Sequence, residues 1–272
     1  MLPVGSFAGK SILITGGGSG LGLAMSIAFG RLGGHVVIAS RNEDHRRNGV
    51  NRVRAAGGKA SEVRLDLLDS GSVEAAFERA PPIDVLVNNA AANFYAASET
   101  ISERGWDTIV DRVLKGAFLC SRSFARRVIA RGSGGAILNM VATTGIEGGP
   151  GVALSGAAKA GVINLTKSLA VEWASDGIRL NALAPGIVPH EDDDEKTNSG
   201  RLHFGDAGRA SIPLGRFARG EEIAWLATYL CSDFAAMVTG QIIVLDGGLS
   251  LPTTLVKPPY APIRSQIPER VR

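Results

Sequence analysis

A glycine-rich turn near the start of the chain constrains the fold more than any other feature. Residues 11–15 form a short, β-branched apolar run, and residues 20–32 then carry apolar side chains at helical spacing. A glycine-rich turn between a strand and a helix lets backbone N–H groups approach a pyrophosphate at the helix N-terminus. The chain has 35 glycines among 272 residues, so the glycines alone are a weak signal. Their position after a strand and at the start of a helix makes a tight turn without a ligand the weaker explanation. We therefore expect a dinucleotide to bind at Thr15, Gly16, Gly18, Ser19, Gly20, Leu21 and Gly22.

Strand-like and helix-like segments alternate along the rest of the chain. Apolar runs predict strands at residues 11–15, 35–39, 60–66, 84–87, 136–141, 179–184 and 241–245. Helical spacing predicts helices at 20–32, 43–56, 72–80, 104–131, 156–173 and 221–231. The strands are continuous apolar runs, as in sheets that helices cover on both faces. The pattern predicts an α/β fold, a doubly wound, mostly parallel, seven-stranded Rossmann sheet with helices on both faces.

The composition shows no break that would mark a second domain. Residues 1–272 are therefore predicted to form a single Rossmann-type domain. Residues 189–212 stand apart because they include an acidic run at 191–195 and several glycines. This segment is either an ordinary solvated loop or a mobile lid over a site at the strand C-termini. The proline-rich tail from about residue 250 is expected to extend over the surface.

The end of the second predicted strand bears on the choice of cofactor. This end carries Ser40, Arg41 and Asn42. In a Rossmann sheet an acidic residue at this place accepts the 2′-hydroxyl of NAD, whereas a neutral residue followed by arginine accommodates a 2′-phosphate. The sequence therefore favours NADP(H), and the alternative is that Arg41 is one of several surface arginines.

Charge and composition argue against several other classes of protein. The net charge of +3 is dispersed, so nucleic-acid binding is not expected. No apolar stretch reaches the roughly 18–20 residues that cross a bilayer, and no secretory signal is visible. We therefore expect a cytoplasmic protein with no membrane partner. Cys120 and Cys231 form no C-x-x-C motif and the four histidines lack ligand spacing, so no metal site is predicted.

Further motifs follow the later strands. Asp66-Leu67 follows the third, Asn88-Asn89-Ala90-Ala91 the fourth, Pro185-Gly186 the sixth and Asp246-Gly247-Gly248 the last, with Lys159 on the helix after the fifth. With the glycine turn, these motifs resemble the short-chain dehydrogenase/reductase superfamily over about residues 8–250. The resemblance implies a homo-oligomer, a tetramer formed through the two long helices. It also implies that Asp66 and Leu67 flank the adenine, that Asn89 and Ala90 pass under the cofactor ribose, and that Pro185, Gly186 and Ile187 face the nicotinamide carboxamide.

The catalytic residues usual in that superfamily are mostly replaced. Its Tyr-x-x-x-Lys pair reads Ser155-x-x-x-Lys159, which a helix places on one face within one turn. The usual serine is Ala142, and the usual asparagine of the long helix is Val113. Reduction of a ketone needs a proton at the oxygen of the carbon that accepts the hydride, and a serine hydroxyl is a much weaker acid than a phenol. Conjugate reduction avoids this need because charge appears on a distant carbonyl oxygen, where hydrogen-bond donors suffice.

One subfamily has this pattern. The chain resembles the 2,4-dienoyl-CoA reductases in its Asn89-to-Phe94 segment, in Asp111-x-Val113-Leu114-x-Gly116, and in the Ser155–Lys159 pair. That resemblance implies NADPH-dependent reduction of an acyl thioester, in fatty acid metabolism. It also implies that Asn93 binds the thioester carbonyl, that Ser155 lies near the nicotinamide and that Lys159 holds its ribose. Thr144 stands where the mitochondrial-type enzymes carry a catalytic tyrosine, so its hydroxyl is a further candidate catalytic group.

Three alternatives remain open from the residues. Asn93 has an ordinary explanation as a turn-forming residue, and Tyr95 could instead supply the missing phenol. A carbonyl or alcohol oxidoreductase of the same superfamily would follow from such a donor. A catalytically silent NADP-binding sensor or structural protein would follow if no donor exists.

Overall fold

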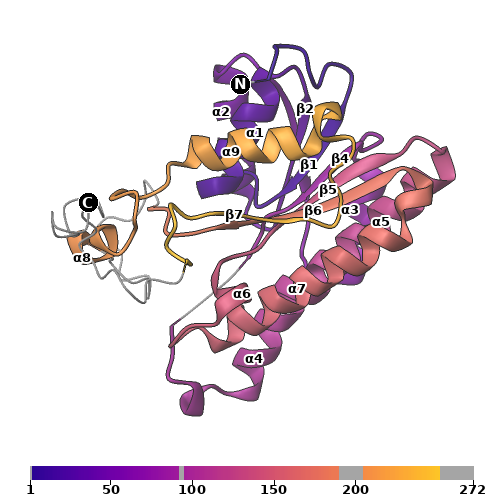
Figure 1. The fold of residues 1–272 in the computed structure, drawn as a ribbon. Coiled ribbons are helices and arrows are strands. Elements are labelled where there is room, and N and C mark those ends of the chain that lie inside the picture. Colours follow the sequence, from indigo (N-terminus) through magenta and orange to yellow (C-terminus); the bar gives the residue numbers. More distant parts are fainter. Residues whose placement is uncertain (1, 92–94, 190–204, 252–272) are drawn as a thin grey trace, which may run out of the picture.

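The structure, a computed structural model, describes residues 2–91, 95–189 and 205–251. Within these residues a single sheet contains seven strands in the order β3-β2-β1-β4-β5-β6-β7, and all neighbouring strands run parallel. Figure 1 shows this twisted sheet edge-on between its helices. The strands are β1 (Ser11–Thr15), β2 (His35–Ser40), β3 (Lys59–Arg64), β4 (Val85–Asn88), β5 (Gly135–Met140), β6 (Ile178–Pro185) and β7 (Ile242–Leu245). The predicted fold is confirmed.

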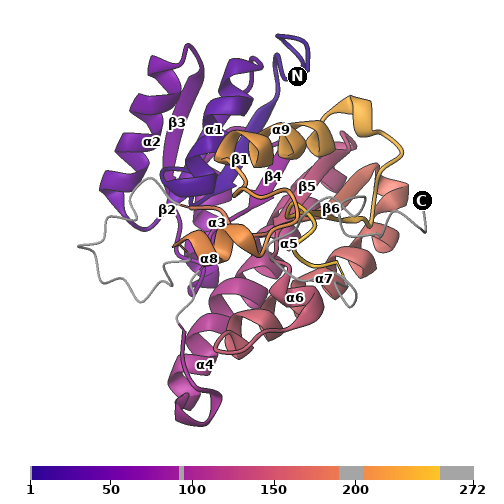
Figure 2. The same ribbon diagram turned by 60° about the vertical axis from the view of Figure 1, so that its left-hand side comes forward.

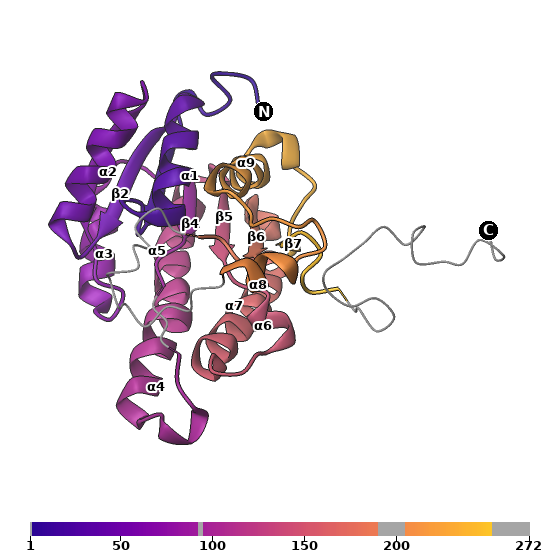
Figure 3. The ribbon, with the colours of Figure 1, turned by 90° about the vertical axis from the view of Figure 1, so that its left-hand side faces the viewer.

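Helices cover both faces of the sheet. The first group consists of α1 (Gly20–Arg31), α2 (Glu43–Ala55) and α9 (Gly220–Cys231), and the second of α3 (Ser70–Arg79), α5 (Gly116–Arg131) and α7 (Ala153–Glu172). Figures 2 and 3 show the first group on one side of the strands and the second on the other. Each strand therefore buries both of its faces, which explains why the strands are continuous apolar runs.

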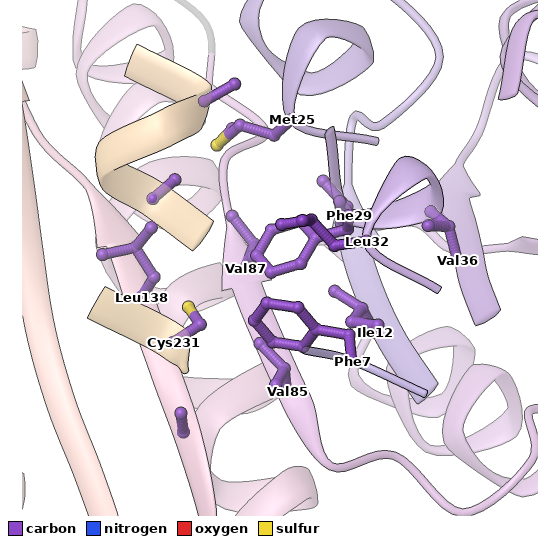
Figure 4. Close-up of a cluster of buried hydrophobic side chains, with 14 of the residues drawn as sticks. Phe7, Ile12, Met25, Phe29, Leu32, Val36, Val85, Val87, Leu138 and Cys231 are labelled. Carbon is purple, nitrogen blue, oxygen red and sulfur yellow. The ribbon is translucent and has the colours of Figure 1, made fainter. Parts of the chain in front are cut away.

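The core beneath α1 illustrates this packing. Phe7 and Phe29 meet edge to face with their ring centroids 4.9 Å apart, and both are fully buried. Figure 4 shows them among Ile12, Val85 and other apolar side chains that link β1 and β4 to α1 and α9. Edge-to-face aromatic pairs add to the stabilisation from burial. This core holds the last turns of α1 against the start of β1 and so fixes α1 on the sheet.

The segment predicted as one long helix at residues 104–131 is helical without a break, but it is not α-helical throughout. It consists of α4 (Glu103–Val110), a π-helical segment at Asp111–Lys115 and α5. A π turn takes one extra residue per turn, so the helical periodicity of the sequence does not reveal it, and such turns are frequent at functional sites. The structure also contains two short helices that the periodicity missed, α6 (Thr144–Glu147) and α8 (Gly205–Ala210).

The topology defines one edge of the sheet as the place for a ligand. The strand order reverses between β1 and β4, and parallel sheets bind ligands outside the carboxyl ends of strands at such a reversal. The glycine turn, Asn89 and Thr144 follow β1, β4 and β5 at this edge. Most of the predicted lid, residues 190–204, and the tail, residues 252–272, lie outside the described residues.

Candidate active site

The glycine turn is joined to the end of β4 by the Thr15 side chain. Its buried hydroxyl donates to the carbonyl of Val87 at 3.3 Å and accepts the N–H groups of Asn89 and Ala90, each at 2.9 Å. The Asn89 amide returns the link by donating to the Thr15 carbonyl at 3.0 Å. Residues predicted to contact two different parts of a dinucleotide therefore belong to one rigid unit.

Gly22 lets the first turn of α1 approach this unit closely. A Cβ at this position would stand 2.1 Å from the Gly16 carbonyl oxygen and 2.7 Å from the Asn89 amide nitrogen, closer than any side chain tolerates. The turn thus brings backbone N–H groups together at the start of a 12-residue helix, whose N-cap, Ser19, makes no side-chain capping hydrogen bond. This is the geometry that a pyrophosphate requires, so the residues present fit a dinucleotide cofactor. Thr15 ends β1, and the other predicted residues up to Gly22 lie in this turn or the first turn of α1.

The loop after β2 presents a partly exposed cationic side chain. Ser40 and Asn42 are committed to the backbone, since the Ser40 hydroxyl accepts the Asn42 N–H and the Asn42 side chain caps α2 at His45. Arg41, by contrast, keeps 55% of its side chain exposed and lies 4.0 Å from the Asp66 carboxylate. A residue that sequence reasoning missed, Arg46, fixes this loop by donating to the carbonyls of Ser40 and Arg41, both at 2.9 Å. The sequence indicated only that Arg46 belongs to a polar helix, predicted at residues 43–56.

The loop after β3 brings Asp66 and Leu67 to the same edge. The Asp66 carboxylate accepts the N–H of Leu68 at 3.1 Å, which shapes the turn. Leu67 is buried against the start of α5, where a Cβ on Gly116 would stand 2.9 Å from its own Cβ. Asp66 therefore faces Arg41, and Leu67 forms part of the floor of the site.

The segment after β6 closes the far side of the site. The Gly186 N–H donates to the carbonyl of Leu245 on β7 at 3.0 Å, and the carbonyl of Ile187 accepts the Ala218 N–H at 3.4 Å. The Asp246 carboxylate holds its own loop by accepting the N–H groups of Gly248 and Ser250 at 2.8 and 2.7 Å. Pro185, Gly186 and Ile187 thus leave the sheet on a fixed path.

The three described residues of the predicted catalytic set meet where α6 packs on α7. Gly145, the second residue of α6, stands so near α7 that a Cβ there would lie 2.7 Å from the Lys159 Cβ. Gly156 of α7 is equally close to α6, since a Cβ there would be 3.1 Å from the Thr144 carbonyl. The structure thus brings α6, which begins at Thr144, against the turn of α7 that carries Ser155 and Lys159. Asn93 lies outside the described residues.

Ser155 and Lys159 have different environments within this group. The buried Ser155 hydroxyl donates to the carbonyl of Val152 at 3.3 Å, so its hydrogen is directed along its own helix. The Lys159 amine donates to the carbonyl of Met140 at the end of β5. Burial lowers the pKa of Lys159 to about 8 because removal from water disfavours the ammonium. The charge of Lys159 is thus held against the effect of burial.

A small pocket lies beneath Lys159, between the sheet edge and the helices α5 and α7. It is lined by Thr15, Leu67, Asn88, Ala90, Val113, Ala117, Met140, Lys159 and Val162. Val113, which the π turn carries, makes its wall apolar where the superfamily usually has an asparagine. A buried polar chain through Asn88, Asn139 and Thr166 approaches the pocket from the sheet. Sequence reasoning missed this chain, because the signal consisted of lone polar residues in otherwise apolar segments.

Two other classes of site receive no support in the part of the chain that the structure describes. None of its groups of histidine, cysteine, aspartate and glutamate could hold a metal ion. No described helix has both the length and the apolar character that crossing a bilayer demands.

Comparison with known proteins decides the family. Residues 16–250 match a family model described as enoyl-(acyl carrier protein) reductase. A crystal structure of a short-chain dehydrogenase from Bacillus anthracis superposes with a TM-score of 0.82 at 40% identity, covering 89% of this chain and 97% of that one. The chain belongs to the short-chain dehydrogenase/reductase superfamily. It is accordingly an oxidoreductase with a nicotinamide cofactor site.

Two further members indicate the range of activities nearby. A protein of Bacillus subtilis strain 168, named as a probable 2,4-dienoyl-CoA reductase that produces (2E)-enoyl-CoA, is 40% identical over 244 residues, covering 88% of this chain and 96% of its own. A candidate 2-deoxy-D-gluconate 3-dehydrogenase of Agrobacterium tumefaciens, solved with bound NADP, has a TM-score of 0.81 at 34% identity and covers 90% of this chain and 98% of its own. Membership of this short-chain dehydrogenase/reductase superfamily therefore leaves the substrate to be argued from the site.

Proposed function

We propose that this short-chain dehydrogenase/reductase uses NADPH to reduce a conjugated acyl thioester of the 2,4-dienoyl-CoA type. The observation that carries the proposal is the state of Ser155, one helical turn before Lys159. Its hydroxyl is buried, directed at the Val152 carbonyl, and far less acidic than a phenol. A reductase that must protonate an oxygen on the reacting carbon is poorly served by this group, whereas a conjugate reductase does not need it.

The remaining residues have roles suited to conjugate reduction. NADPH, when bound, supplies a hydride to the far end of the conjugated system, and a carbon of the resulting enolate would then take a proton from solvent. The Lys159 ammonium would hold the ribose hydroxyls and keep a positive potential beside the reacting atoms. Asn93, through its amide N–H, and Thr144, through its hydroxyl, would donate to the thioester oxygen as negative charge develops there. The relative of Bacillus subtilis named for dienoyl-CoA reduction supports this substrate class.

Arg41 supports NADPH over NADH. Its guanidinium is half-exposed beside the Asp66 carboxylate, and a loop that Arg46 fixes presents it at the end of β2. A 2′-phosphate at that strand end would meet a preorganised cation, and charge-assisted hydrogen bonds of this type are strong.

The test is NADPH consumption against matched panels of 2,4-dienoyl-CoA, 2-enoyl-CoA and simple ketones, with NADH as the control cofactor. We expect turnover on the dienoyl thioester and a preference for NADPH. Product analysis by NMR would show a lost double bond and an intact carbonyl. Turnover of ketones with none of the dienoyl thioester would contradict the proposal.

One observation favours a second candidate, a carbonyl reductase that takes its proton from Tyr95. The Tyr95 ring lies beside Gly151, with Cδ1 3.7 Å from the place of a Cβ there, and the next residue donates its N–H to the Gly151 carbonyl at 3.1 Å. Gly151 belongs to the loop that leads into α7. Tyr95→Phe separates the candidates, because it would abolish ketone reduction by this route and leave conjugate reduction of the thioester largely intact.

We also propose that copies of the chain assemble through the long helices. Trp106 of α4 and Phe118 of α5 expose 44% and 37% of their surface, which leaves apolar area on these helices for a second copy to cover. Light scattering should give the mass of a tetramer, and a monomer at micromolar concentration would contradict this assembly.

A further inference from the structure

The orientation of a buried amide, Asn88 at the end of β4, is decided by a residue two turns along α7 from Lys159. Thr166 is fully buried, and its one hydroxyl hydrogen is donated to the carbonyl of Val162 at 2.7 Å. Its oxygen can therefore only accept from Asn139, whose Nδ2 lies 2.9 Å away. This fixes the Asn139 side chain with its nitrogen toward α7 and its Oδ1 toward β4.

The orientation of the Asn139 amide then determines that of the Asn88 amide. The Asn139 Oδ1 is an acceptor and receives the Asn88 Nδ2–H at 2.8 Å. The same nitrogen also donates to the Ser121 hydroxyl at 3.0 Å and lies 3.4 Å from a second group that can only accept, the Ala117 carbonyl. Rotating the Asn88 amide by half a turn would place an oxygen against both acceptors, so its Oδ1 must face away from them. In the described structure this Oδ1 is buried and has no hydrogen-bond partner.

The Asn88 side chain is also part of the wall of the pocket beneath Lys159, and only 8% of the residue's surface is exposed. A buried acceptor without a partner is costly, so a native structure normally satisfies it. The pocket has room for about one water molecule. On its other side stands an amine with three N–H groups when protonated, one of which is committed to the Met140 carbonyl.

We propose that Asn88 is a positioning residue for Lys159, whose ammonium its Oδ1 holds through one water molecule in this pocket. The Lys159 N–H donates to the water, and the water donates to the Asn88 Oδ1. Because the acceptor lies at the end of this chain, the water presents its lone pair to the amine and stabilises the charged form. A reversed Asn88 amide would present N–H groups instead, turn the water hydrogens toward Lys159 and favour the neutral amine.

The Thr166–Asn139–Asn88 chain thus transmits the direction of a hydrogen bond from α7, through β5 and β4, to the amine. None of the three side chains, Thr166, Asn139 and Asn88, is charged. Burial is the one cause that lowers the pKa of Lys159. The inference concerns the site of the proposed reductase, but it depends only on Lys159 and its described neighbours and not on the substrate.

The experiment measures the titration of Lys159 directly, in the full chain without cofactor. With [ε-13C]lysine, the seven lysines give separate NMR signals, and Lys159→Arg assigns the signal of interest. Thr166→Val removes the hydroxyl that sets the direction without changing any residue of the pocket wall. We expect the midpoint of the Lys159 titration to fall by about one pH unit, which corresponds to the loss of a hydrogen bond to the charged form.

Two matched variants make the result specific. Thr166→Ser keeps the hydroxyl and should keep the wild-type midpoint. Thr228→Val removes an equivalent buried threonine hydroxyl, which donates to the Trp225 carbonyl at 2.8 Å on α9, across the sheet. It should lower the melting temperature while leaving the Lys159 titration unchanged.

Asn88→Ala tests the proposal independently, because it removes the acceptor itself. It should lower the midpoint of the Lys159 titration at least as far as Thr166→Val. Midpoints for Thr166→Val and for folded Asn88→Ala within about 0.2 pH unit of wild type would overturn the proposal. So would an equal shift in Thr228→Val. Since no substrate is used, failure of the dienoyl thioester assay would leave this result unaffected.

Discussion

Lys159 should make the protein less stable at neutral pH than it would be without this residue. Burial lowers the pKa of Lys159 to about 8 from the ordinary value of 10.5. One pKa unit corresponds to about 1.4 kcal/mol, so holding the ammonium costs the folded state at most about 3.5 kcal/mol, part of which a water in the pocket would return. This is a large share of the roughly 5–15 kcal/mol that stabilises a typical domain. Lys159→Met fills similar space without a charge and should raise the free energy of unfolding at pH 7 by about this amount.

The stability difference between wild type and Lys159→Met should depend on pH. Below pH 8 the folded and unfolded chains both carry the proton, so the full cost is present. Between about pH 8 and 10.5 the folded chain releases the proton while the unfolded chain keeps it, and the stability of the wild type therefore rises with pH through this window. Above 10.5 the amine is neutral in both states and the advantage of Lys159→Met should vanish.

The assay is urea unfolding of wild type and Lys159→Met at several pH values across that window. Burial also raises the pKa of Cys120 and Cys231 to about 12, which lowers stability as pH rises above the ordinary thiol value of 9.0. Both proteins contain these thiols, so the difference between the two unfolding curves cancels their effect. Lys167→Met, on the exposed face of the same helix, is the matched control and should show no such pH-dependent difference.

The reasoning would be refuted if Lys159→Met were less stable than wild type at pH 7, or if their difference did not shrink between pH 8 and 10.5. The variant should also lose most of its turnover while its melting temperature rises. A residue that costs stability and yet supports activity is expected at a reacting site, since charge is held there against its preference for water.

Three further predictions concern the cofactor and the substrate. Arg41→Ala should weaken NADPH binding about 10–100-fold and leave NADH nearly unchanged, because one charge-assisted contact is lost; equal losses by fluorescence titration would assign Arg41 a structural role. Asn93→Ala should lower kcat on the dienoyl thioester by about 10²–10³-fold with little change in KM, as for the loss of one oxyanion donor. If Asn93→Ala had a lower melting temperature but a normal kcat, Asn93 would only form a turn and would not bind the thioester oxygen. Gly22→Ala should abolish cofactor binding, since its Cβ would stand 2.1 Å from the Gly16 carbonyl, and calorimetric titration of the folded variant checks this; Ala24→Gly, two residues further into α1, is the control and should still bind.

The binding half of the site was largely predictable from the sequence. Local order suffices there, because the apolar run at 11–15, the glycines at 16–22 and the helical spacing after them specify a strand, a turn and a helix in succession. The replacements at Ser155, Ala142 and Val113 were equally visible, since each is a single residue at a fixed distance from a motif. These features are determined by chain neighbours, and the periodicity of apolar residues then selects the parallel sheet.

The tertiary structure alone decided how the catalytic half is held. The π turn at Asp111–Lys115 turns Val113 toward the pocket, although the sequence there continues a helical pattern. Asn88, Asn139 and Thr166 are separated by 51 and 27 residues along the chain, yet they form one hydrogen-bonded line between β4, β5 and α7. The pKa of Lys159 depends on burial beneath α6 and on the direction of that line. Hydrogen-bond direction and removal from water are set by neighbours distant in the sequence, so they exist only once the helices have closed over the sheet.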